Sequence, residues 1–277
     1  MSGFAGTKAP QAGFARLASA GTGVGYASVG RMEWIKLRTV RSTGWVMAVF
    51  AVGMITLAVL MLTLQNPASM SGTELAEFDS VEQGFAGLEI AVVALSVLGV
   101  LVIAGEYGTG MIRATFAAVP NRPLVFAAKA AVLGAVTLAV GEALAFAAFF
   151  IGQAVLREGL PEASIGDPGV LRAVLMAGVF PALAALTGLG FGAMIRHTAG
   201  AIAAVLGWLL VLPVVLYPLP GHAWVSKWAP LQIVQDSMVA VKPVAGALPA
   251  WTGLLVVCGS TALALIGGAM VMARRDA

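Results

Sequence analysis

Long apolar stretches alternate with short polar ones along most of this chain. Six windows contain almost only apolar and small residues, at about 44–64, 85–104, 129–152, 171–195, 199–217 and 250–272. About 20 such residues in a helix cross the hydrocarbon core of a bilayer. Water is absent there, so the backbone must satisfy its own hydrogen bonds, and the alternation typical of membrane β-strands is missing. The pattern predicts an all-α integral membrane protein with six transmembrane helices.

The polar segments predict how the chain is organised. Residues 1–30 are rich in Gly, Ala, Ser and Thr and are expected to form a flexible cytoplasmic tail, followed by a single transmembrane domain over 31–277. Residues 31–42 mix basic and apolar side chains, which is typical of an amphipathic helix lying on the inner headgroups. A contact surface for a cytoplasmic partner is the alternative. The candidate residues of this interfacial helix are Arg31, Trp34, Lys36, Arg38 and Arg41.

Tryptophan and proline mark a second surface segment. Residues 218–249 contain Trp224 and Trp228, and tryptophan is enriched at membrane interfaces. This segment is expected to lie on the outer lipid surface as a short helix.

The positions of the charges predict the orientation. With a cytoplasmic N-terminus, twelve of the 16 lysines and arginines fall on the inner side, while the outer segments carry most of the acids. Cytoplasmic connections accumulate Lys and Arg, so both termini are predicted to be cytoplasmic. The net charge of +3 therefore reports orientation, and no nucleic-acid partner is expected.

Motifs for catalysis are missing from the sequence. With 60% hydrophobic and only 10% charged residues, little chain remains for a soluble catalytic domain. No GxxxxGK[ST] phosphate loop occurs, and the topology places the two histidines, His197 and His222, on opposite sides of the membrane. The single cysteine, Cys258, excludes a disulfide or a cysteine-based metal site within one chain. We expect no enzyme activity, metal or cofactor in this chain alone.

Two acidic residues fall inside the predicted spans. Buried carboxylates are costly in a bilayer and usually face a bundle interior or a water-filled cavity, so Glu89 and Glu142 are candidates for a substrate path. Glu89 lies about one turn from the outer end, where contact with the headgroups is the alternative. Glu142 lies near mid-span, where a role in pairing helices is equally open. The small residues at 188–192, GLGFG, predict close helix packing.

The connection between the second and third spans, residues 105–130, reads GEYGTGMIRATFAAVPNRPLVFAAKA. It predicts a short amphipathic helix from Met111 to Val119, held on the inner surface between two spans. Such a helix can receive a push from a soluble partner and pass it to both spans. An ordinary membrane-surface loop is the alternative.

This connection resembles that of permease subunits of type-two ABC exporters, particularly those of high-GC actinobacteria. The matching residues are Glu106, Gly110, Arg113, Pro120, Arg122 and Lys129. Many members have Gly-Thr where this chain has Gly110-Met111. The resemblance implies a non-catalytic permease of the bacterial cytoplasmic membrane that pairs with a second permease subunit, as a homodimer or heterodimer. It also implies that these residues face a separate ABC ATPase, which binds ATP and Mg and drives outward transport.

Two other functions remain open from the sequence. A proton-coupled secondary carrier would use Glu142 and Glu89, although the two halves of the chain show no convincing internal repeat. A non-transporting membrane scaffold or an immunity-type protein is the third hypothesis.

Overall fold

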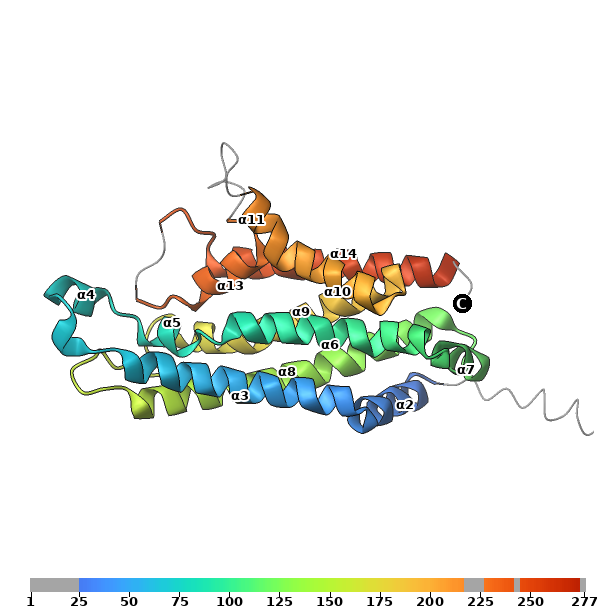
Figure 1. Ribbon diagram of the computed structural model, residues 1–277, viewed down its shortest axis with the longest axis horizontal. Coiled ribbons are helices and arrows are strands. Elements are labelled where there is room, and N and C mark those ends of the chain that lie inside the picture. The colour runs from blue at the N-terminus through green and yellow to red at the C-terminus, as the bar shows by residue number, and fades with distance from the viewer. Residues whose placement is uncertain (1–24, 217–226, 242–244, 275–277) are drawn as a thin grey trace, which may run out of the picture.

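The computed structural model describes residues 25–216, 227–241 and 245–274, and everything stated about the structure concerns these residues (Figure 1). This part of the chain is helical and contains no strand. The predicted tail up to residue 24, His222 and Trp224 lie outside it. The elements are α2 (Tyr26–Thr39), α3 (Arg41–Leu64), η1 (Pro67–Ser69), α4 (Gly72–Glu77), α5 (Ser80–Gly84), α6 (Leu88–Gly108), α7 (Met111–Ala118), α8 (Arg122–Val155), α9 (Val170–Ile195), α10 (Thr198–Leu206), η2 (Gly207–Val211), α11 (Leu212–Leu216), α13 (Pro230–Met238) and α14 (Ala250–Arg274).

Five helices are long and apolar enough to cross a membrane, namely α3, α6, α8, α9 and α14. They confirm the prediction of an all-helical, multi-pass membrane protein. The fifth window, 199–217, differs from the continuous helix that was predicted. It is divided into α10, the π-helical turn η2 and α11, and its apolar helical stretch, Thr198–Val211, is shorter than a full span. A π turn interrupts the regular backbone ladder, and Pro213 just beyond it lacks a backbone donor.

Several helix boundaries also differ from the prediction. Helix α2 begins at Tyr26, so residues 26–30, expected in the tail, are helical, and Arg41 begins α3 instead of belonging to the interfacial helix. Helix α8 begins at Arg122, seven residues before the window that predicted it. Asn121 fixes this start, because its side chain accepts a hydrogen bond from the Leu124 backbone N–H.

Helix α9 occupies the centre of the bundle, with α6, α8 and α14 packed around it (Figure 1). Glycines allow these backbones to approach closely. A Cβ atom on Gly188 would lie 1.9 Å from the Ser96 carbonyl oxygen, and one on Gly99 would lie 1.8 Å from that of Ala185. The predicted role of the 188–192 glycines in close packing is confirmed, since Gly190 meets Ala264 of α14 in the same way.

Helices α9 and α14 run parallel. The hydroxyls of Thr187 and Thr261 are hydrogen-bonded at 2.9 Å, and further along both helices Arg196 donates to the Val271 carbonyl at 3.1 Å. At the start of α9, Arg172 donates to the carbonyls of Ser237 and Val239 at 3.2 and 2.9 Å. Residue 198, just after the end of α9, and residue 237, beside its start, therefore lie near opposite ends of the bundle.

The segment around α13 is part of the bundle. Ile233, Val234 and Met238 are buried, and α13 packs on α14, α9, α6 and α5. Asp79, which caps α5, also accepts hydrogen bonds from the backbone N–H groups of Ala240 and Val241 at 2.6 and 2.8 Å. The short helix predicted within 218–249 therefore exists, but its apolar side is covered by protein.

Candidate functional site

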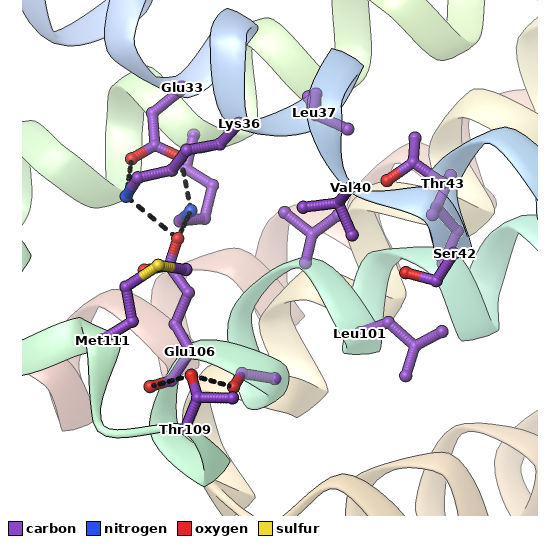
Figure 2. A pocket seen from close by; sticks show the side chains of 14 residues that line it. Glu33, Lys36, Leu37, Val40, Ser42, Thr43, Leu101, Glu106, Thr109 and Met111 are labelled. Carbon is purple, nitrogen blue, oxygen red and sulfur yellow. Dashed lines mark hydrogen bonds and ion pairs between the residues drawn. The ribbon is translucent and has the colours of Figure 1, made fainter.

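Four charged side chains meet (Figure 2) at the end of the bundle where α2 and α7 lie (Figure 1). Lys129 of α8 donates to Glu33 of α2 and, at 2.9 Å, to Oε1 of Glu106 of α6. Lys36 donates to Oε1 of Glu33 and to the same Glu106 oxygen, both at 3.0 Å. We call Glu33, Lys36, Glu106 and Lys129 the ion network. It joins three helices that are far apart in the sequence.

The ion network is almost closed to solvent. The exposed fraction is 1% for Lys129, 2% for Glu33 and 4% for Glu106. Ions buried this deeply are stable only when their charges are balanced and hydrogen-bonded, and here two carboxylates balance two ammonium groups. The network therefore stabilises one specific arrangement of α2, α6 and α8.

Lys36 is the half-buried member of the network. Burial alone would lower the pKa of its ammonium group, but the charges of Glu106 and Glu33 and their hydrogen bonds outweigh it and raise the pKa above its ordinary value. Lys36 is therefore held in its charged form at neutral pH.

The short helix α7 is attached to the same network. The third hydrogen bond of Lys36 goes to the Thr115 hydroxyl of α7, at 3.1 Å, and Ile112 of α7 is buried beside it. Gly110, with a left-handed φ of 71°, makes the sharp turn from α6 into α7, a conformation in which a side chain would be strained. The opposite side of α7, which includes Arg113, is exposed.

The structure brings together two predicted sets of residues that the sequence had kept apart. Lys36, expected at the headgroups, pairs with Glu106, expected at the membrane edge, and Lys129 lies two turns inside α8 instead of at the start of a span. Of the other residues predicted to face the ATPase, Arg113 and Pro120 are exposed. The Arg122 guanidinium lies over the Phe116 ring at 5.3 Å. Arg31, Trp34 and Arg38 of α2 and Arg41 of α3 are exposed.

Glu33 is the network residue that sequence reasoning missed. Its spacing of three residues from Lys36 was the available signal, because such residues lie on one face of a helix.

The two intramembrane acids lie apart from the network. Glu89 accepts a hydrogen bond from Gln235 of α13. Glu142 packs against Gly178 of α9, where a Cβ atom would lie 2.4 Å from the carboxyl carbon, and its buried Oε2 has no hydrogen-bond partner among the described residues. No group of three or more His, Cys, Asp or Glu side chains within the described ranges could hold a metal ion.

No family model matches the sequence, and no curated protein is significantly similar to it.

Proposed function

We propose that this chain is the transmembrane permease subunit of an ATP-driven ABC exporter in a bacterial cytoplasmic membrane. The observation that carries the proposal is the attachment of α7 to the ion network. An exposed short helix, placed between two long apolar helices, is tied through Lys36 to Glu106 of α6 and, through Glu33, to Lys129 of α8. This arrangement suits a surface that receives force from a soluble subunit.

The mechanism follows from this connection. A separate ABC ATPase docks on α7, binds ATP and Mg, and supplies all the catalytic residues. Its closure displaces α7, and the buried ion network passes the displacement to α6 and α8 together. The bundle and that of a second permease subunit then shift between two states that expose the substrate path to opposite sides.

The course of the chain supports six crossings with both termini inside. Helices α9 and α14 are parallel, so the segment that includes α10, η2 and α11 must recross the bundle. The α2 and α7 end carries the exposed Arg31, Arg38 and Arg113 and is assigned to the cytoplasm.

The proposal is tested with Arg113→Glu on the exposed side of α7. This variant is co-expressed with the candidate ABC ATPase. We expect the ATPase activity that the permease stimulates to fall about tenfold, because a docking contact becomes repulsive. Arg157→Glu, in the exposed loop just after α8 at the end that we assign to the outside, is the matched control and should behave as the wild type. Glu106→Lys is less suitable, because a third buried cation would unfold the network.

Two results would contradict the docking proposal. One is a stable permease that neither co-purifies with the ATPase nor stimulates it. The other is an Arg113→Glu variant that stimulates the ATPase as well as the wild type does. Stable binding without vectorial transport in proteoliposomes would favour the scaffold hypothesis.

The buried Oε2 of Glu142, which no described residue contacts through a hydrogen bond, favours a second candidate, a proton-coupled carrier. In that case an imposed pH gradient should drive transport in proteoliposomes without any ATPase, and Glu142→Gln should abolish it. Transport that depends on ATP and survives Glu142→Gln would exclude this candidate.

A further inference from the structure

A pocket of about 250 Å³ lies beside the ion network, between α2 and α3 on one side and α6 on the other (Figure 2). Its walls are mainly apolar and include Leu37, Val40, Leu98, Leu101, Val102 and Met111. All four residues of the ion network also line it. The pocket thus has an apolar body and a charged, hydrogen-bonding end.

Two residues of the ion network that line the pocket, Glu106 and Lys129, make fewer hydrogen bonds than their side chains allow. Lys36 uses its three N–H donors on Glu33, Glu106 and Thr115, whereas Lys129 makes two hydrogen bonds. Oε2 of Glu106 is buried and has no partner among the described residues. An ammonium group has three N–H donors. Among the described residues, Lys129 therefore has one donor without an acceptor, and Glu106 has one acceptor oxygen without a donor.

A hydroxyl group matches both of these requirements, because it donates one hydrogen bond and accepts others. The charges restrict the ligand further. The ion network is neutral, so a cationic or anionic headgroup would add an unbalanced charge at a site that excludes water.

We propose that this pocket binds a neutral, single-chain amphiphile with a hydroxyl headgroup, taken from the inner leaflet. The hydroxyl would bind at the charged end of the pocket, after a small turn of the Glu106 side chain that brings its buried Oε2 to the pocket wall, and the tail would lie along Leu98, Leu101 and Val102. An apolar cavity of about 150 Å³ accommodates benzene, so the volume here suits a medium-length aliphatic chain. Val40 and Met111, which are 44% and 42% exposed, show that the pocket reaches the surface of the protein.

The test uses the full chain in phospholipid nanodiscs, without any ATPase, and an eight-carbon alcohol carrying a photoreactive diazirine. We expect saturable adducts on residues 98–111 and 40–43, mapped by mass spectrometry. An excess of n-octanol should prevent this labelling, while the same concentration of n-octane, which lacks the hydroxyl, should not. Equal protection by the alkane, or labelling that does not saturate, would overturn the proposal.

Two tryptophan variants distinguish binding of the probe in this pocket from its general partitioning into lipid. Leu101→Trp fills the pocket and should reduce saturable labelling at least tenfold. Leu138→Trp, on an exposed part of α8, is the matched control and should leave labelling unchanged. Unchanged labelling of Leu101→Trp would also overturn the proposal, and none of these measurements depends on the exporter function.

Discussion

Lys129 carries its charge at a position with almost no solvent contact, where Glu33 and Glu106 compensate it. Removal of one partner from a buried ion pair leaves an uncompensated charge and costs about 3–5 kcal/mol. We predict this loss of stability for Lys129→Met and a smaller one for Lys36→Met, whose side chain is 21% exposed and can be replaced by water.

The stability losses of Lys129→Met and Lys36→Met are compared by thermal unfolding of the purified variants in detergent. Arg38→Met, exposed on α2, serves as the control and should unfold close to the wild type. A loss for Lys129→Met that is no larger than the loss for Lys36→Met would contradict this order.

Glu82 gives a prediction that depends on pH. Glu82 is exposed at one side of α5, but partial desolvation disfavours its charged form and Asp79 and Asp236 repel it, so the pKa of Glu82 lies above the ordinary 4.5. A raised pKa means that its contribution to stability is full below pH 4.5 and is lost as the pH rises through the folded value. Glu82→Gln should therefore raise the melting temperature at pH 7 and have little effect near pH 4.

The control for this pH dependence is Glu158→Gln, on the exposed loop after α8. It should show no such difference between the two pH values. A gain for Glu82→Gln that persists unchanged at pH 4 would contradict the assignment.

At the scale of residues, the sequence predicted the candidate site in part. Glu106 and Lys129 were singled out by the motif of residues 105–130, and Lys36 by the basic segment before the first span. Their pairing was not predictable, because it depends on how α2 folds back against α8. That fold places Glu33, one acid among many basic residues, at a buried position.

At the scale of elements, the contact between α6 and α9 depends on glycine. A methyl group on Gly188 would lie 1.9 Å from the Ser96 carbonyl oxygen, which is a backbone atom that cannot move aside. We predict that Gly188→Ala separates the two helices and lowers stability by several kcal/mol, beyond the usual cost of a core change. Thermal unfolding in detergent and the yield of monodisperse protein measure the effect.

Gly259→Ala in α14 is the matched control. Nothing lies within 4 Å of its added methyl group, and alanine favours a helix over glycine by about 1 kcal/mol. This variant should be as stable as the wild type or slightly more stable. Similar behaviour of the two variants would contradict the assigned packing.

Two elements show what periodicity can and cannot predict. Helix α7 was predicted nearly to its ends, because the spacing of its apolar residues is a local property. The fifth window was predicted as one helix because its composition is uniformly apolar. Its division at 207–211 is a π turn that lies just before Pro213, and a uniformly apolar composition does not record where a helix changes its hydrogen-bond pattern.

At the scale of the whole molecule, the orientation can be measured directly. In a Cys258→Ala background, Ala76→Cys on the exposed side of α4 should react with a membrane-impermeant maleimide on intact cells. Ala117→Cys on α7 should react only after the cells are opened. The reverse result would place α7 and the ion network on the outer side and remove the proposed docking surface.

The close approach of Gly141 in α8 to Gly178 in α9 has a mechanical consequence. At 1.5 Å per residue, Gly141 lies roughly 28 Å from the start of α8 at Arg122 and roughly 21 Å from its end at Val155. If α8 tilts as a rigid rod about this contact, its two ends move in opposite directions. A push of about 3 Å at the α7 end then produces about 2 Å of opposite movement at the far end, beside Gln153 and the loop that it holds.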